Sequence, residues 1–521
     1  MNKHNLQRYG LIAFSTLSFF IGTLLFFQIY IDDAFIFFKY GYNLIHHGIW
    51  SWSIVGKPSE AYTSFIYAVL SIFPPLLNVS PAIFIKIMGL LFLLGLLYRL
   101  YSGISDKRWA LLGIALLLSN WEVYVHAYSG LETILWVWLL LETFFIVKEE
   151  NISTAKQTRL WIICLLMTLT RPEGAIFAIC FFVYLKFYKK QSLNFWSISI
   201  VVLIGILYFI ARFWYFGLLF PLPFYHKVMD NHFSGILVLI FNIYTSWHYI
   251  ICAGLILYFF RKQKIIFYAG ILFFSIYIAL YAKSFLVMNY ADRFPFQLFV
   301  PFILFAFISL EKSTYFNKVK LVLIMFFLNL IIFSKGIYDN NLIELASIEV
   351  NAGSAFYLPR SHYSLAKNIN KIKGVEDKHL KVFFGDAGMF PYFVKATCYD
   401  YNGLTDAYIA KHPLTDEYFD KISPDVVLIG TPKDKKEDLK EDLTNCRTIY
   451  YMAENRKFEY KYLGRAISKK DGYYVHVYCK TTMSYSAELE AALNNGIQES
   501  ENAIFRIKRF LKLKYLNLDN I

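Results

Sequence analysis

The chain has 521 residues, of which 57% are hydrophobic and 19% aromatic, and its formal net charge is +14. This composition is typical of a polytopic membrane protein and excludes the templates of soluble enzymes. Because the Lys and Arg residues fall mainly in short clusters between apolar runs, the positive charge indicates membrane topology, and no nucleic-acid partner is expected.

The first apolar run extends from Tyr9 to Tyr30 and is long enough to cross a bilayer, which takes about 20 helical residues. It is too long for a signal-peptide core and lacks a small-residue cleavage site, so we interpret it as a retained helix. Ten further apolar runs follow, at about 82–98, 109–128, 132–147, 160–170, 173–185, 195–216, 235–260, 265–282, 294–310 and 321–335. Together they predict about eleven transmembrane helices.

Basic clusters between these runs predict the topology. They lie at Lys3–Arg8, Arg99–Arg108, Lys148–Arg159, Lys186–Lys190, Arg261–Lys264 and Lys312–Lys320. Because basic loops stay in the cytoplasm, the N-terminus is expected inside and the C-terminal region outside.

One apolar segment must stay out of the membrane for this topology to hold. Residues 62–77 are short, contain Pro74 and Pro75, and have no basic flank on the far side. We expect an interfacial or re-entrant helix there, within a long first outer loop from Asp32 to about Pro81. The runs 160–170 and 173–185 are predicted to form a hairpin with its tip at the outer surface.

Two adjacent carboxylates, Asp32 and Asp33, stand where the chain leaves the first helix. An acidic pair at that depth is costly without a partner or a task, which makes it a functional hypothesis. The alternative is that both are hydrated caps of the next helix. Aromatic and basic residues are interleaved through Ile31–Ser64, which favours the functional interpretation.

Charges of both signs gather at the predicted outer helix ends. They are Glu60, Glu122, His126, Glu132, Arg171, Glu173, His226, Lys227, Asp292 and Arg293. Such a set indicates a polar cavity that opens outward. The alternative is that each is an ordinary interface residue that extends its head group to water.

Beyond residue 336 the apolar runs shorten to strand length, at 381–388, 424–430, 447–453 and 472–479, with helical spacing at 362–373 and 433–442. The sequence therefore divides into a transmembrane domain (1–335), an extracytoplasmic α/β domain (336–483) and a helical tail (484–521). The tail could lie on an anionic membrane or pack on the domain. Cys398, Cys446 and Cys479 could form at most one disulfide.

The first helix followed by DDAFIFFKYGYNLIHHG and GKPSEAYTS resembles the outer loop of the GT-C glycosyltransferases. Within that superfamily the chain is most similar to the terminal arabinofuranosyltransferase type, which includes cell-wall β-(1→2)-arabinofuranosyltransferases and the arabinosyltransferase that decorates pilin. Further matching stretches are Ser129–Thr133, Leu169–Gly174, Pro221–Lys227, Gly385–Gly388 and Gly403–Asp406. The resemblance implies transfer of a sugar, arabinofuranose, from a polyprenyl-phosphate carrier to a glycan or protein acceptor outside the bacterial cytoplasmic membrane.

Such a transfer needs a base for the acceptor hydroxyl and cations for the departing phosphate. The resemblance implies Asp32 or Asp33 as the base. The candidates for binding the donor phosphate are Arg171, Arg293 and Lys227, with arginine favoured for bidentate contact. The residues expected to contact substrate are Glu60, Tyr62, Glu132, Glu173, His126 and His226, although each histidine could instead be structural. No cofactor is required, and the two adjacent aspartates would allow a divalent metal.

Two other classes of function stay open at this point. A transporter or flippase of lipid-linked glycan would also have many helices and buried charge, but it predicts inverted repeats and ionisable groups near the midplane. A receptor or assembly subunit would leave the acidic pair unexplained. The expected partners of the enzyme are the lipid-linked donor, the acceptor and membrane lipids.

Overall fold

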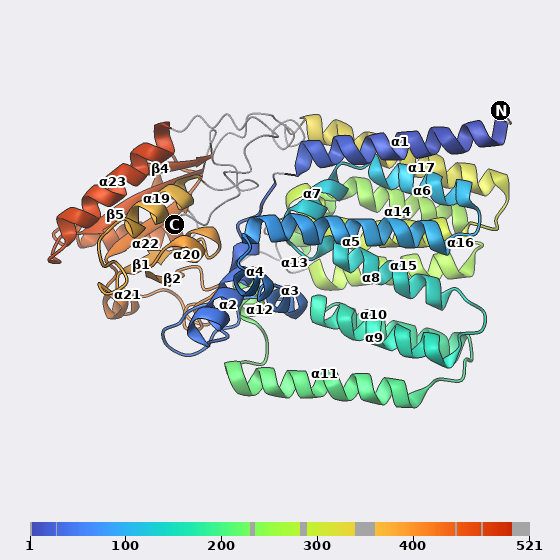
Figure 1. Cartoon of the computed structure of the whole chain (residues 1–521), viewed down its shortest axis with the longest axis horizontal. Helices are drawn as coiled ribbons and strands as arrows, with labels where there is room; N and C mark the ends of the chain where they lie inside the picture. The colour runs from blue at the N-terminus through green and yellow to red at the C-terminus, as the bar shows by residue number, and fades with distance from the viewer. Residues whose placement is uncertain are drawn as a thin grey trace.

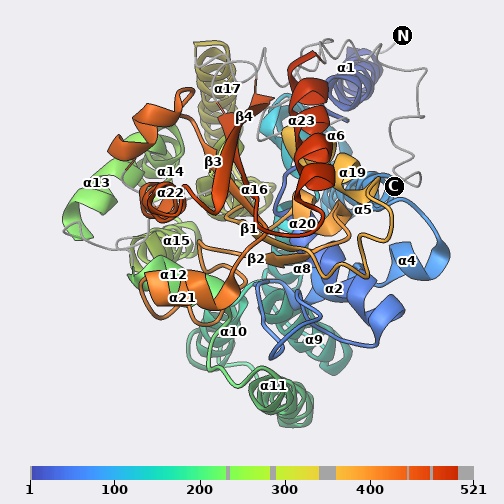
Figure 2. The ribbon, with the colours of Figure 1, turned by 90° about the vertical axis from the view of Figure 1, so that its left-hand side faces the viewer.

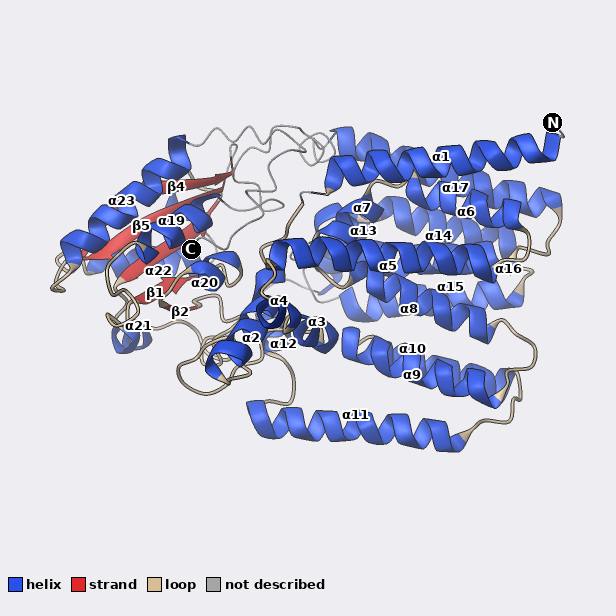
Figure 3. Cartoon of the chain, in the orientation of Figure 1, coloured by secondary structure: helices blue, strands red, loops and turns tan. Residues whose placement is uncertain are grey.

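The computed structural model of the chain describes residues 3–27, 29–229, 235–281, 289–338, 360–442, 445–469 and 473–502. It consists of a bundle of long helices and an α/β domain that lies at one end of that bundle (Figure 1). The strands of the described residues all lie in this domain (Figure 3). The predicted helical membrane fold with a C-terminal α/β domain is therefore confirmed.

Each predicted apolar run folds as a helix or a helix pair, in the predicted order. These are α1 (Lys3–Phe26), α5 (Pro81–Gly103), α6 (Lys107–Leu118) with α7 (Glu122–Tyr128), α8 (Thr133–Val147), α9 (Thr154–Thr170), α10 (Gly174–Val183) with η1 (Tyr184–Tyr188), α11 (Phe195–Phe216), α13 (Gly235–Thr245) with α14 (Trp247–Phe260), α15 (Lys264–Tyr281), α16 (Arg293–Ser309) and α17 (Tyr315–Tyr338). Within the described ranges, six helices are long and apolar enough to cross a membrane, or eight if each bent pair is one span. The count of about eleven crossings stays a prediction, because α8, α9 and α10 are shorter.

Two of these runs are sharply bent. The axes of α6 and α7 meet at 77°, and α14 meets the helix before it at 83°. At the first bend the side chain of Asn120 accepts the backbone N–H of Glu122, the first residue of α7, at 2.9 Å. The bends turn Glu122 and His248 into the interior, where each is at most 2% exposed.

The central helix of the bundle is α16, because 94% of the residues in its most apolar stretch are buried. Trp109 of α6 stacks on Phe307 of α16 with ring centroids 4.0 Å apart, and its indole N–H donates to the Phe307 carbonyl. Gly113 allows this approach, because a methyl group there would overlap the Phe307 ring. Arg293, the first residue of α16, is also buried.

The basic loops gather at the end of the bundle away from the α/β domain (Figure 1). Glu311, after α16, pairs with Lys148 at 3.3 Å and accepts the backbone N–H of Asp106 at 3.1 Å. Glu142 of α8 pairs with Arg99 at 3.0 Å and with Arg159 at 2.7 Å. The positive-inside rule requires the basic loops to lie on one side of the membrane, and here they lie at one end of the bundle. The orientation of the bundle in a membrane stays a prediction.

The segment predicted as the first outer loop, from Asp32 to about Pro81 and called the outer loop below, lies between the bundle and the α/β domain (Figure 1). It contains α2 (Ala34–His47), α3 (Phe65–Leu70) and α4 (Phe73–Leu77). The Ser64 side chain caps α3, and α4 ends at Asn78, whose left-handed φ of 55° stops the helix. The segment 62–77 therefore forms two short helices at the end of the bundle beside α2 (Figure 1).

The domain is built on a five-stranded sheet in the order β2-β1-β3-β5-β4, with β1 (Lys381–Phe384), β2 (Thr397–Tyr399), β3 (Val426–Thr431), β4 (Tyr460–Lys469) and β5 (Tyr473–Lys480). β1 runs parallel to β2 and β3, and β5 runs antiparallel to β3 and β4. The strand predicted at 447–453 is wrong, because these residues belong to helix α22 (Asn445–Asn455). Its buried residues Cys446, Ile449, Tyr450 and Ala453 follow helical spacing.

Helices cover both faces of the sheet (Figure 2). On one side lie α19 (Arg360–Asn370) and α23 (Ser486–Asn502), and on the other α21 (Asp416–Ile422) and α22. Of the predicted tail, α23 packs on α19 and β4, and the basic residues beyond 502 lie outside the described residues. The boundaries at 335 and 483 stay predictions. All six cysteines are free, so Cys398, Cys446 and Cys479 form no disulfide.

Candidate active site

The acidic pair lies between the bundle and the α/β domain. It follows α1 directly, and the backbone N–H of Ile31 donates to the Ser129 carbonyl at 3.1 Å, which fixes the pair against the loop before α8. Both carboxylate oxygens of Asp32 accept backbone N–H groups of the domain, Oδ1 from Met389 at 2.8 Å and Oδ2 from Gly388 at 3.1 Å. Asp32 therefore connects the first outer loop to a turn more than 350 residues away.

Burial raises the pKa of Asp32 to about 6. The electrostatic interaction with His362 and the N–H of Met389 act in the opposite direction, while the charges of Asp386 and Asp33 raise the pKa further. A carboxylate with a pKa near 6 is ionised at pH 7 and is more basic than an ordinary aspartate. Asp32 is thus suited to accept a proton at neutral pH.

Asp33 occupies the N-cap position of α2, with its charge acting on Tyr290 and Arg293 of the bundle. Tyr290 donates its hydroxyl to Ser129 Oγ at 3.2 Å. The two neighbouring carboxylates therefore differ in environment. Asp32 contacts the α/β domain, and Asp33 acts electrostatically on the start of α16.

A buried cluster of two arginines and two glutamates joins four helix ends. Glu132 Oε1, at the N-cap of α8, accepts from Arg171 at the end of α9 at 2.5 Å and from Arg293 of α16 at 2.8 Å. Arg171 also binds Glu173, at the N-cap of α10, at 2.9 Å. The structure thus brings together Arg171, Arg293, Glu132 and Glu173, which the sequence predicted as site residues.

Several atoms of this Arg–Glu cluster have unused hydrogen-bonding capacity. Within the described part of the chain, Glu132 Oε2, Glu173 Oε2 and the Nε atoms of Arg171 and Arg293 are buried without a hydrogen-bond partner. Buried polar groups of this kind are normally satisfied. The two Nε–H donors could therefore bind an anionic ligand.

A second buried ion pair fixes the other end of the outer loop. Arg212 of α11 pairs with Glu60 at 2.5 Å and donates to the carbonyls of Leu218 and Leu219. Burial raises the pKa of Glu60, and Arg212 opposes that shift. We did not predict Arg212 as a site residue, although a lone arginine inside an apolar run is a signal that could have identified it.

Two other predicted residues have structural partners. Tyr62 accepts the indole N–H of Trp50 at 2.9 Å and packs on Tyr40, with ring centroids 4.7 Å apart. His126 is fully buried, and its Nε2 contacts the carbonyl of Ala291 at 2.8 Å. These contacts support the structural alternative for His126.

The remaining predicted residues, His226 and Lys227, have side chains outside the described part of the structure. Their backbone belongs to α12 (Leu222–Met229). At the start of this helix, the backbone N–H of Leu222 donates to the backbone carbonyl of Glu60 at 2.9 Å. The helix therefore begins next to the Glu60–Arg212 pair. The roles of His226 and Lys227 stay predictions.

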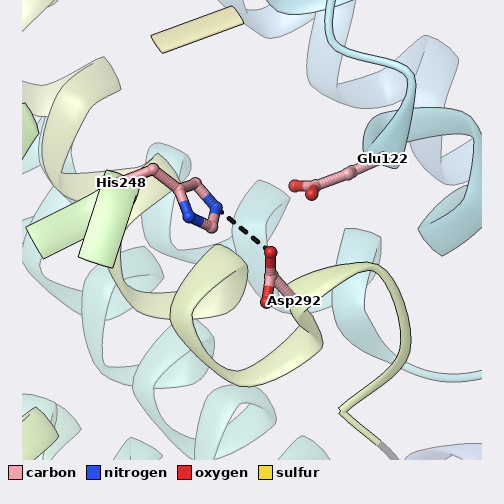
Figure 4. A group of neighbouring side chains, drawn as sticks. All are labelled: Glu122, His248 and Asp292. Carbon is pink, nitrogen blue, oxygen red and sulfur yellow. Dashed lines mark ion pairs between the residues drawn. The ribbon is translucent and has the colours of Figure 1, made fainter. Parts of the chain in front are cut away.

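A separate buried group, Glu122, His248 and Asp292, has the residue types of a metal site (Figure 4). Its ligand atoms lie within 4.8 Å of one another. However, Asp292 already contacts Lys335 Nζ at 2.8 Å and His248 Nε2 at 3.1 Å, and Glu122 accepts the hydroxyl of Tyr249. Lys335 thus supplies the positive charge that a metal ion would bring.

This Glu122–His248–Asp292 group holds a strained turn immediately before Arg293. Ala291 and Asp292 have φ values of 45° and 48°, in the left-handed region that non-glycine residues rarely adopt. The contacts of Asp292 with Lys335 and His248 hold the second of these residues. The group therefore helps to set the direction in which Arg293 enters the Arg–Glu cluster. Neither Lys335 nor His248 was predicted as a site residue.

A cavity of about 380 Å³ lies between α8, α10, η1, α15 and α16. It is lined by apolar and aromatic side chains, among them Phe144, Phe181, Tyr184, Tyr268 and Phe273. Among the predicted site residues whose side chains the structure describes, none lines it. Its chemistry suits a hydrocarbon chain.

Comparison with solved structures identifies the fold. Two crystal structures of ArnT from Cupriavidus metallidurans, one bound to undecaprenyl phosphate and one in the apo state, each match with a TM-score of 0.52. In both, 11% of the residues are identical, and the match covers 89% of this chain and 97% of ArnT. The chain therefore shares the fold of ArnT, and the GT-C-like fold class expected from the sequence is confirmed.

Two sequence comparisons complete this result. Residues 361–478, which contain the sheet, match the family described as Domain of unknown function (DUF8728). No curated protein matches the sequence.

Proposed function

We propose that the chain is a glycosyltransferase that transfers arabinofuranose from a polyprenyl-phosphate donor to a glycan or protein acceptor on the outer face of the bacterial cytoplasmic membrane. The observation that carries the proposal is the placement of two adjacent carboxylates: Asp32 is held by two backbone N–H groups of the α/β domain, and the charge of Asp33 acts on Arg293 of the buried Arg–Glu cluster. The donor class is supported by ArnT, which shares the fold and has been solved with undecaprenyl phosphate. Arabinofuranose is supported by the motifs of the first outer loop.

In the proposed reaction Asp32 accepts the proton of the acceptor hydroxyl. The hydroxyl oxygen then forms a bond to the anomeric carbon of the donor sugar while the bond from that carbon to the phosphate oxygen breaks. The lipid phosphate leaves with the electron pair of the broken bond. Arg171 and Arg293 stabilise its charge, because guanidinium groups can donate two parallel hydrogen bonds to a phosphate.

The rate of transfer is expected to depend on pH with a midpoint near 6. Asp32 can act as a base only when it is ionised, and burial raises its pKa to about 6. The rate should therefore fall about tenfold per unit as the pH drops below this value, whereas an ordinary aspartate would stay active to about pH 4. Initial rates at low acceptor concentration test this, and a midpoint near 4 would contradict the assignment.

Replacing either arginine of the Arg–Glu cluster with lysine is expected to weaken donor binding about tenfold or more. Lysine keeps the charge but cannot make the bidentate contact, and a hydrogen bond to a charged group contributes about 1.5–3 kcal/mol. Binding of a short-chain polyprenyl phosphate to Arg171→Lys and Arg293→Lys measures the effect. Arg159→Lys, at the basic end of the bundle, is the matched control. Unchanged affinity in both cluster variants would contradict the role.

The function itself is tested with purified protein in liposomes and a labelled, short-chain polyprenyl-phosphate arabinofuranose. Transfer of label to an arabinan or glycan acceptor is the expected result. Transfer only from a different polyprenyl-phosphate sugar would keep the enzyme class and correct the donor. Movement of lipid-linked sugar across the bilayer without transfer to any acceptor would favour the transporter or flippase.

A further inference from the structure

We propose that the C-terminal domain is part of the active site, because its Gly385–Met389 turn, here named the GDAG turn, holds and partly covers the carboxylate of Asp32. The turn directly follows β1 and leads into α20 (Met389–Phe393). It lies within the region that matches the domain of unknown function. The inference rests on the proposed function for its kinetic consequence, but the contact itself can be tested without activity.

The contact between Asp32 and the GDAG turn is close and leaves no room for a side chain. A methyl group added to Gly388 would lie 2.1 Å from the carbonyl oxygen of Asp32 and 2.3 Å from its Oδ2. A Cβ atom essentially never comes this close to an atom that is not bonded to it, so any larger residue must push the two segments apart. Only glycine at position 388 allows the N–H groups of Gly388 and Met389 to reach the carboxylate.

Further contacts attach the turn, and the helix α20 that follows it, to the first outer loop. The indole N–H of Trp52 donates to the Ala387 carbonyl at 3.0 Å, and Lys39 Nζ donates to the Pro391 carbonyl at 2.7 Å. The ring of Phe35 packs on Tyr392, with centroids 5.4 Å apart. The turn is therefore docked on the outer loop by several elements and does not rest on Asp32 alone.

The domain supports the turn from behind. Asp386 Oδ2 accepts the hydroxyl of Tyr473, from β5, at 2.6 Å and contacts His362 Nε2, from α19, at 2.8 Å. His362 is 3% exposed on its side chain, and the amide of Asn402 donates to the Gly385 carbonyl at 3.2 Å. These side chains come from separate elements of the sheet domain, so the folded domain is needed to fix the turn.

This arrangement has two consequences for a base. Two N–H groups fix the orientation of the carboxylate, while each oxygen keeps a second lone pair for the acceptor hydroxyl. The turn also packs against Asp32, which is half-buried, and burial is the largest cause of its raised pKa. The charged groups that act on Asp32 are His362 and Asp386 of the domain and Asp33 of the outer loop. Release of the turn would lower the pKa of Asp32 toward that of a hydrated aspartate.

The kinetic test uses Gly388→Ala in the full chain. We expect kcat to fall about tenfold or more with little change in the donor KM, because the base is misplaced and the Arg–Glu cluster is intact. The pH midpoint should move from about 6 toward about 4 as water reaches Asp32. Gly254→Ala is the matched control, since a methyl group there meets nothing within 4 Å. A folded Gly388→Ala protein with the wild-type kcat and pH midpoint overturns the proposal.

A second variant guards against misfolding of the first. Tyr473→Phe removes the hydroxyl that supports Asp386 and adds no atom, so we expect a smaller loss of kcat and a shift of the pH midpoint in the same direction. If Tyr473→Phe keeps both the wild-type kcat and the wild-type pH midpoint, the hydrogen bond from Tyr473 to Asp386 does not help to hold the turn.

The contact is also tested by hydrogen exchange, without any substrate. In Asp32→Ala, peptides covering 385–393 should exchange roughly tenfold faster, because the N–H groups of Gly388 and Met389 lose a charged acceptor. Asp33→Ala is the matched control and should leave these peptides unchanged. Equal exchange in wild type and Asp32→Ala overturns the contact. If Asp32→Ala exchanges faster than wild type but the wild-type protein transfers no sugar, the contact stands and the proposed function alone is overturned.

Discussion

Asp32→Asn is expected to lower sugar transfer by about 10²–10⁴-fold, the range that a positioned general base contributes. The amide cannot take up the proton of the acceptor hydroxyl at neutral pH. In addition, the amide has only one oxygen acceptor. Its NH₂ group would therefore face the N–H donor of Gly388 or Met389, where wild-type Asp32 has an accepting oxygen. The expected loss lies in kcat, with donor binding preserved, and initial rates with labelled donor measure it.

Two comparisons make this result specific to Asp32. Asp33→Asn should retain more activity, because Asp33 acts on Tyr290 and Arg293 and is not held by the GDAG turn. Asp377→Asn removes an exposed carboxylate from the same domain as the turn and should leave the rate unchanged. If Asp32→Asn transfers sugar at the wild-type rate, or if only Asp33→Asn is inactive, Asp32 is not the base.

Glu132→Gln is expected to destabilise the protein by about 3–5 kcal/mol, the cost of leaving a buried charge without its partner. Glu132 is 1% exposed, and one of its oxygens accepts from both Arg171 and Arg293. Removing its charge leaves two buried guanidinium groups with only Glu173 as a directly bonded carboxylate in the cluster. The variant should also lose donor binding, since both arginines change their orientation.

Thermal unfolding in detergent, followed by the loss of helical signal, measures this effect. The matched control is Glu149→Gln, because Glu149 pairs with Lys156 where the two side chains are 34% and 50% exposed. An exposed pair of this kind contributes at most about 1 kcal/mol, so the control should unfold close to the wild-type temperature. Equal shifts in the two variants would contradict a structural role for the buried Arg–Glu cluster.

The helices of the bundle could be predicted because long apolar runs have few alternatives in a membrane. Within the domain the sequence was less informative. Residues 447–453 combine β-branched and aromatic residues, which favour a strand, but Ile449, Tyr450 and Ala453 lie on one buried helical face. Neither signal dominates over seven residues, and packing against the sheet decides the structure.

The candidate site was predicted in its residue types but not in its pairing. The sequence indicated that Asp32, Arg171, Glu132 and Arg293 belong together, because they stand at helix ends on one side of the bundle. It did not indicate that the carboxylate of Asp32 contacts Gly388. The GDAG stretch predicts a turn, but the sequence of a turn does not show which side chain its N–H groups will bind. Contacts between segments this far apart depend on how two folded parts dock.

The separation of Asp32 and Gly388 along the chain has a consequence for biogenesis. The two residues are 356 positions apart, so at about 5–20 residues per second a ribosome needs roughly 20–70 s to add the second after the first. During this interval Asp32 has neither of its two N–H donors. Under the proposed function, the base is completed only when the α/β domain has folded and its GDAG turn has reached Asp32. The nascent chain would then have no sugar-transfer activity before this domain is made.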